Sequence, residues 1–150
     1  DEGSESFNGP GLAKVVAYNE DGSLVREFNT QGMLDAPWGM AIAPAGFGKF
    51  GGDLLVANFG DGTISAFDQT TGNFVDDLRD AKGNIISIDG IWGLVFGNGY
   101  SLGDANSLYF TAGPNSEQDG LFGKLTLAPE PAAASLLVPG LLLLARRRRR

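Results

Sequence analysis

Short apolar runs alternate with polar, glycine-containing turns along most of this chain. The first two runs lie at 14–19 and 24–28, and Glu20-Asp21-Gly22-Ser23 separates them. Such residues favour tight turns, because Gly tolerates positive φ and Asp caps backbone N–H groups. The pattern therefore predicts a β-hairpin near the start of the chain.

The same alternation predicts seven further strands. They lie at 38–43, 54–58, 63–68, 73–78, 91–96, 108–112 and 121–127. Glycine-rich loops at 44–53 and 97–106 separate some of these strands, and an Asp-Gly turn at 59–62 separates two others. Gly supplies 23 of the 150 residues, which fits many tight turns. We therefore expect an all-β fold.

The predicted strands recur with a period near 50 residues. Trp38-Gly39 matches Trp92-Gly93 at a spacing of 54, and Leu54-Leu55-Val56 matches Leu108-Tyr109-Phe110 at the same spacing. Four short strands in such a period are typical of a β-propeller blade. We expect a partial β-propeller of about two and a quarter four-stranded blades within residues 1–128. The blade parts lie at about 14–28, 38–78 and 91–127.

Two blades are fewer than the four to eight, roughly, that a propeller needs. They would leave sheet faces and edges uncovered. We therefore expect the chain to be the C-terminal part of a longer protein, with a small β-sandwich as the alternative. The chain opens with the polar segment DEGSESFNGPG, which fits either an upstream continuation or removal of a signal peptide.

Residues 129–150 have a different composition. Pro129, Glu130 and Pro131 precede the uncharged apolar stretch 132–145, and an arginine cluster ends the chain. As a helix, this stretch would span about 21 Å, against ~30 Å for a bilayer core. We expect a short, marginal C-terminal hydrophobic helix with the arginines on the cytoplasmic side. The cluster comprises Arg146, Arg147, Arg148, Arg149 and Arg150.

This order of three parts resembles a PEP-CTERM sorting signal of Gram-negative bacterial proteins. The resemblance implies that Pro129, Glu130 and Pro131 are the recognition motif and that Arg146 to Arg150 stop transfer through the membrane. It also implies an exosortase, a membrane transpeptidase, as partner. The protein would be exported, anchored transiently in the inner membrane, and released to the cell surface or extracellular matrix. A buried helix with a basic tag and a GPI signal are the alternatives.

The upstream segments VANFGDGTISAFD, DGIWGLVFGNG and LYFTAGPN resemble an uncharacterised family of exported bacterial proteins with NHL- or lactonase-like propeller repeats. This resemblance covers about 38–125. It implies a fold and a location, and no established activity.

Composition excludes several classes of function. The chain has no His and no Cys, which removes the Ser-His-Asp triad, thiolate metal sites and His-ligated zinc or iron. Residues 1–128 carry a net charge of −11, because five of the 11 basic residues belong to the terminal cluster. Such an acidic body repels nucleic acid. We therefore expect no nucleic-acid partner and no recognisable catalytic constellation.

Acidic and amide side chains in the loops are the candidate ligands for a cation. They are Asp35, Asn58, Asp61, Asp89 and Asn115. Calcium takes oxygen ligands of this kind, and the lactonase-like resemblance implies a possible Ca²⁺ site near Asn58 and Asp61. The favoured interpretation is turn formation, because Asp and Asn before Gly stabilise turns. Apart from this Ca²⁺ candidate, the sequence assigns no cofactor.

Trp38 and Trp92 occupy equivalent positions in the repeat, where core packing is favoured over a ligand-facing channel. The hypothesis for function is a cell-surface or extracellular-matrix binding module that contacts exopolysaccharide or a surface protein. The alternatives are a Ca²⁺-dependent lactonase-like hydrolase and a structural matrix component.

Overall fold

The structure, a computed structural model, describes residues 9–28 and 31–128. The sorting motif, the hydrophobic helix and the arginine cluster predicted at 129–150 lie outside the described residues. Nine strands and one 3-10 turn, η1 (Gly48–Phe50), make up the regular structure of the described part. The strands are β1 (Val16–Tyr18), β2 (Leu24–Glu27), β3 (Pro37–Ile42), β4 (Leu54–Asn58), β5 (Ile64–Phe67), β6 (Phe74–Asp77), β7 (Ile91–Phe96), β8 (Leu108–Ala112) and β9 (Leu121–Leu125).

The all-β prediction is confirmed. Every strand expected from the apolar runs is present, and β4, β7 and β8 have the predicted bounds. The other strands differ from the prediction by one or two residues at an end.

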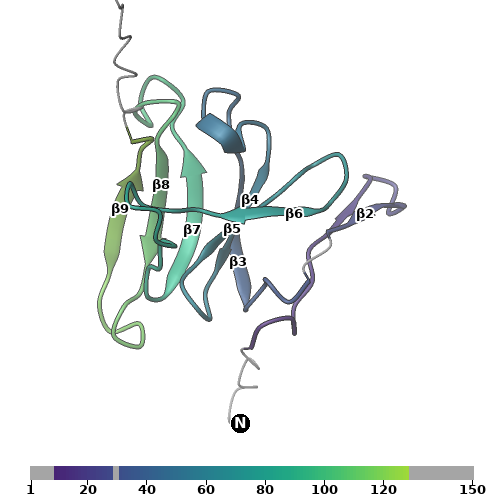
Figure 1. Cartoon of the computed structure of the whole chain (residues 1–150), viewed down its shortest axis with the longest axis horizontal. Coiled ribbons are helices and arrows are strands. Elements are labelled where there is room, and N and C mark those ends of the chain that lie inside the picture. The colour runs from purple at the N-terminus through teal and green to yellow at the C-terminus, as the bar shows by residue number, and fades with distance from the viewer. Residues whose placement is uncertain (1–8, 29–30, 129–150) are drawn as a thin grey trace, which may run out of the picture.

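The strands form three open antiparallel sheets in chain order, β1–β2, β3–β6 and β7–β9 (Figure 1). Each strand pairs with the next one along the chain. The described residues therefore form three successive sheets that do not close into a ring, so the propeller itself is not shown.

The hairpin turns depend on a repeated Asp-Gly unit. In the β1–β2 turn, Asp21 accepts a hydrogen bond from the backbone N–H of Ser23 at 2.9 Å. In the β4–β5 turn, Asp61 accepts the equivalent bond from Thr63 at 2.9 Å. Gly62 lies between Asp61 and Thr63, and its φ of 78° is a value that favours glycine. These local bonds explain why each apolar run ends where it does.

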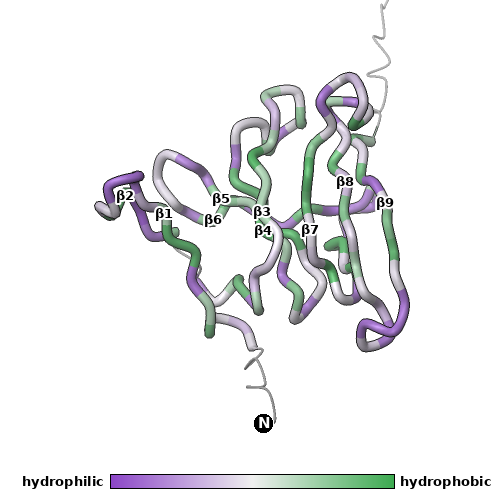
Figure 2. The backbone as a smooth tube through the Cα atoms, turned by 180° about the vertical axis from the view of Figure 1, so that it is seen from behind, coloured by the Kyte–Doolittle hydropathy of each residue, from purple (hydrophilic) through white to green (hydrophobic). Residues whose placement is uncertain are grey.

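Two apolar cores hold the three sheets together. The larger core lies between β3–β6 and β7–β9, and the smaller one lies between β1–β2 and β3–β6. Phe47, from the β3–β4 loop, packs edge-on against Phe96 of β7 at 4.9 Å. Phe28, after β2, packs edge-on against Phe67 of β5 at 6.1 Å. Figure 2 shows the apolar residues along the strands and the polar ones at the hairpin turns.

The first strands of the two larger sheets, β3 and β7, lie side by side near the centre of the structure (Figure 1). Their backbones approach most closely at Gly39, where a Cβ atom would lie 2.9 Å from the Leu94 nitrogen. Real Cβ atoms do not come this close to backbone atoms, so only glycine fits. At the first Trp-Gly pair, the packing of β3 against β7 therefore requires the glycine.

A group of charged side chains fastens η1 to the outer strand β6. The Asp76 carboxylate accepts hydrogen bonds from Lys49 Nζ at 2.6 Å and from Arg79 Nη2 at 3.1 Å. The hydrogen bond from Lys49, followed by that from Arg79, lowers the pKa of Asp76 from 3.8 to about 2. The side chains of Lys49 and Asp76 are 59% and 26% exposed, so solvent screens much of this attraction.

We predict that Gly39→Ala destabilises the protein and that the equivalent change, Gly93→Ala, is tolerated. A methyl group at Gly39 meets the β7 backbone, and such overpacking costs about 2 kcal/mol. At Gly93 the methyl group meets only the Thr111 hydroxyl, which can move at the cost of one exposed hydrogen bond from the Gly93 N–H. Urea unfolding of both variants measures the difference, and equal midpoints would contradict the close approach of β3 and β7.

We predict that Asp76→Asn lowers the free energy of unfolding by about 0.5 kcal/mol at pH 7. The folded pKa lies below the unfolded value, so the carboxylate stabilises the fold above about pH 4. This stabilisation is lost as the pH falls toward the folded pKa of about 2. Urea midpoints of both proteins between pH 7 and pH 2 should therefore converge. A difference that persists at pH 2 would assign the effect to another cause.

Candidate functional site

One end of the inner strands β3 and β7 carries most of the polar residues singled out in the sequence. The segment before each strand has the same form, Asp-x-x-Trp-Gly, with Asp35 and Trp38 at β3 and Asp89 and Trp92 at β7. The Trp-Gly part of this repeat was found from the sequence, and both aspartates were named there as candidate ligands, but their shared spacing of 54 was not noticed. We call this end of the molecule the loop end.

The backbone of the loop end repeats as closely as its sequence. Phe59 N–H donates to Ala36 O at 3.0 Å, and Gly113 N–H donates to Gly90 O at 2.8 Å. Ala36 and Gly90 both have positive φ, 48° and 64°. Ala36 is therefore held in a conformation that costs a non-glycine residue about 1 kcal/mol or more. The repeat preserves the turn geometry even where the residue type does not favour it.

Hydrogen bonds between loops join the two sheets at this end. Ser87 Oγ donates to Asp61 O at 2.8 Å, which links the β4–β5 turn to the segment before β7. Asn115 N–H donates to Asp89 Oδ2 at 3.1 Å, which links that segment to the β8–β9 loop. The five candidate ligands thus belong to one continuous set of loops.

Asn58 is the central polar residue of the loop end. Its side chain is fully buried, and its Oδ1 accepts from Asp35 N–H at 3.2 Å. Its Nδ2 lies within hydrogen-bonding distance of Met33 O at 3.2 Å, Thr63 Oγ1 at 2.9 Å and Ser65 Oγ at 3.0 Å. The amide therefore ties the loop before β3 to the β4–β5 hairpin.

The polar network continues from Asn58 into the sheet. Ser65 is also fully buried, and its hydroxyl donates to Asp77 Oδ1 at 2.8 Å. Asp35, 7% exposed, accepts from Gly9 N–H at 2.7 Å. Among the described residues, no buried side-chain polar atom lacks a partner. Sequence analysis did not foresee Ser65 or Asp77, whose only signal is a polar residue at an inward position of a strand.

The two weak calcium candidates have defined structural contacts. The Asn58 oxygen bonds within the chain, and Asp61 Oδ1 accepts from the backbone and hydroxyl of Thr63 at 2.9 and 2.8 Å. Within residues 9–28 and 31–128, no three His, Cys, Asp or Glu side chains gather in a way that could hold a metal ion. The arrangement of Asp61 is that of a turn-capping carboxylate.

The two tryptophans have different surroundings, and the prediction of core packing is wrong for Trp38. Trp38 is 68% exposed, and its ring lies 6.3 Å from that of Phe59, tilted by 46°. Trp92 is half-buried, with its ring beside Gly113. The physical reason is that exposure depends on what covers each ring: Phe59 covers only part of Trp38, whereas the β8–β9 loop lies against Trp92 at Gly113. Together, Trp38 and Phe59 present an aromatic surface at the loop end.

Two hollows of the described structure lie away from these aromatic rings. One, of about 530 Å³, runs between β1 and β3 and is lined by Val16, Met40 and Ile42 among others. Another, of about 330 Å³, lies on β7–β9. The loop end is therefore an exposed surface with an aromatic platform rather than an enclosed pocket.

The comparisons with known proteins found uncharacterised viral relatives. The chain is 41% identical over 116 residues to the uncharacterized protein L690 of Acanthamoeba polyphaga mimivirus, which covers 77% of the chain and 30% of that protein. It is 37% identical over 121 residues to the uncharacterized protein R648 of the same virus, covering 81% of the chain and 29% of that protein. The chain thus spans less than a third of the length of these relatives. No family model and no solved structure matches it.

These relatives overturn the assignment made from the tail. The prediction of a Gram-negative PEP-CTERM protein, with its sorting signal, exosortase and transmembrane helix, is wrong, because the similar proteins belong to a mimivirus. The prediction rested on 22 residues of simple composition, while the similarity to the viral proteins extends over most of the chain. Within the part that the structure describes, no helix has the length and apolar character needed to span a bilayer.

We predict that Asn58→Ala lowers the free energy of unfolding by about 3 kcal/mol, because it leaves the buried Asp35 N–H without its partner and removes the amide's bonds to Met33, Thr63 and Ser65. Asn19→Ala is the matched control. Asn19 is exposed and its Nδ2 bonds to Ser23 Oγ, so its loss should cost about 0.5 kcal/mol or less. Chemical denaturation compares the variants. Equal stabilities would show that the buried network does not hold the loop end together.

Proposed function

We propose that this chain is part of a β-propeller-like protein and that its loop end is a binding surface for carbohydrate. The observation that carries the proposal is the exposed Trp38 beside Phe59, at the end where the loops of successive sheets meet. The three sheets would be consecutive blades, with β3 and β7 as inner strands.

Three findings support the propeller-like arrangement. The sheets follow one another in chain order as antiparallel meanders. The first strands of the two larger sheets lie against each other. The Asp-x-x-Trp-Gly segment and its backbone bonds recur at a spacing of 54, as expected for a radial repeat. The relatives are also more than three times as long as the stretch that they share with this chain, enough for further blades.

Aromatic platforms and acidic surroundings together define the class of ligand. An exposed indole offers a flat apolar face with one polar edge, which suits the C–H face of a sugar ring. Asp61 and Asp89 are exposed at the same end and would repel anionic polymers. We therefore propose a neutral or cationic polysaccharide. Such a ligand would place the module at a cell surface or in an extracellular matrix.

Affinity electrophoresis in gels that contain neutral polysaccharides, such as dextran, galactomannan or soluble chitin oligomers, tests this function. We expect at least one polymer to retard the protein and Trp38→Ala to weaken the interaction about tenfold, because the stacking surface is lost. The matched control is Trp92→Phe, a change at the half-buried equivalent position, which should keep the affinity.

Two outcomes would count against the proposal. Equal retardation of Trp38→Ala and the unchanged protein would remove the aromatic platform from the site. The absence of retardation by every polymer in these gels would favour a purely structural component. Circular dichroism of each variant verifies that the sheets are intact.

A further inference from the structure

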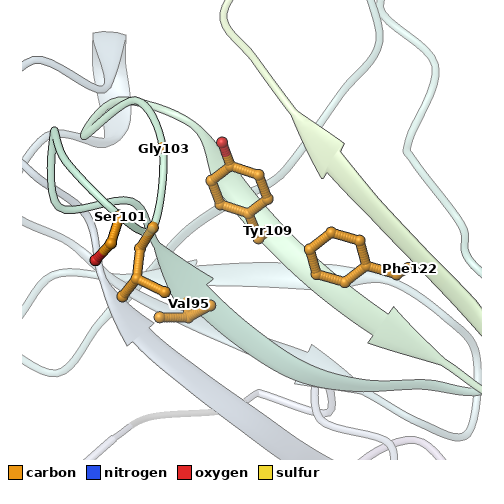
Figure 3. A pocket seen from close by; sticks show the side chains of 6 residues that line it. Val95, Ser101, Gly103, Tyr109 and Phe122 are labelled. Carbon is orange, nitrogen blue, oxygen red and sulfur yellow. The ribbon is translucent and has the colours of Figure 1, made fainter.

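The outer face of the β7–β9 sheet carries exposed apolar side chains and is uncovered in the described structure, with Thr111 and Lys124 as the polar residues paired beside them. Val95 and Phe122 are 48% and 68% exposed, and the ring of Tyr109 stacks on that of Phe122 at 5.9 Å. Figure 3 shows these side chains from three adjacent strands on one side of the sheet, with Ser101 and Gly103 of the β7–β8 loop above them. Two hollows of about 330 and 210 Å³ share Val95, Tyr109 and Phe122 in their linings. We call this surface the outer face.

The repeat identifies what the outer face corresponds to. Val95 is equivalent to Ala41, Tyr109 to Leu55, and Phe122 to Ile64, by the spacings of 54 and 58. In the β3–β6 sheet, Leu55 and Ile64 are fully buried and Ala41 is partly buried. All three pack in the core between that sheet and β7–β9. The face that is covered in one sheet is therefore open in the next.

We propose that the outer face is a sheet–sheet interface that takes a further sheet of this same repeat. This inference rests on the propeller-like arrangement proposed above and names the partner of its last described sheet. The incoming sheet would cover Val95, Tyr109 and Phe122 as β7–β9 covers Ala41, Leu55 and Ile64.

The existing interface indicates what the incoming sheet must carry. β7–β9 packs on β3–β6 through Leu94, Phe96, Leu108 and Phe110. A further sheet therefore needs large apolar residues at these positions of its first two strands. The backbone leaves room for it, because Gly93, the equivalent of Gly39, has only the Thr111 hydroxyl near its missing Cβ. At Gly39 the space left by the missing Cβ is occupied by the β7 backbone.

The length of the relatives favours a sheet from the same polypeptide over a foreign partner. The aligned stretches make up 30% and 29% of the two relatives, so most of each relative lies outside the shared part. Sheets that repeat along one chain reach each other at a high effective concentration. A second separate copy of the chain is an alternative occupant that the experiment below distinguishes.

The register of the strands defines an extended chain for the test. Leu54 pairs with Phe67 in β4–β5, and Leu108 pairs with Leu125 in β8–β9, so Leu125 and Phe67 are equivalent. Inserting a second copy of residues 68–125 after Leu125 of the full chain thus completes the third sheet and adds a fourth in register. The chain has no cysteine, so a cysteine in place of Phe122 can be labelled specifically with a maleimide.

We expect Phe122→Cys, made in the first copy only, to label about tenfold or more slowly in the extended chain than in the original chain, because the added sheet buries it. Val25→Cys on β2 is the matched control. Its side chain is 49% exposed, and β2 lies at the opposite end of the molecule from β9 (Figure 1), so labelling should be equally fast in both chains. Sedimentation at the labelling concentration must show monomers, since protection in a dimer would assign the face to a second copy.

A second variant covers the case in which the added repeat fails to fold. Phe122→Lys, again in the first copy only, should leave the urea midpoint of the original chain unchanged and lower that of the extended chain. An added repeat that stays unfolded or undocked gives fast labelling at position 122 and no effect of the lysine, and either result overturns the proposal. Neither readout involves Trp38, so failure here is distinct from failure of carbohydrate binding.

Discussion

Sheet-on-sheet burial of apolar side chains is the interaction on which this protein depends. The middle sheet, β3–β6, carries apolar residues on both faces, with Leu55 and Ile64 on one side and Val56 and Phe67 on the other. A sheet with two apolar faces cannot stand alone in water and needs a neighbour on each side. Gly39 permits the required distance on the side of β7. The two apolar cores lie on either side of this middle sheet, so the arrangement of the other two sheets follows from this stacking.

A second constraint acts at the loop end, where the interactions are polar rather than apolar. The Asn58 side chain forms hydrogen bonds with both the loop before β3 and the β4–β5 hairpin, and the Ser65 hydroxyl extends this network to Asp77 of β6. A buried amide with all its groups bonded restricts the loops to one arrangement, because any other leaves a polar group unpaired. This rigidity is what lets an exposed side chain such as Trp38 keep a fixed position without an enclosing pocket.

The local pattern of the sequence predicted all nine strands, because apolar runs and Asp-Gly turns act over a few residues. It also predicted the repeat, since Trp38-Gly39 and Trp92-Gly93 are visible by inspection. It did not predict that the two tryptophans differ, because exposure depends on which sheet lies next to each of them. The network of Asn58 and Ser65 joins residues whose partners are set by strand register, which short-range patterns do not specify. The assignment from the tail failed for another reason: its composition is simple, and it carries less information than the similarity along the strands.

The β1–β2 hairpin has a consequence for how the molecule opens. Its strands have three and four residues, and among the described residues it has a neighbouring sheet on one face only and no strand paired beyond β1 or β2. Each sheet in a linear stack is held mainly by its immediate neighbours, so local opening is easiest at a thin end. Thermal fluctuations should therefore detach this hairpin while β4 and β5 stay closed. Stability in this protein is graded along the stack, and a protease would meet the hairpin long before it reached the middle sheet.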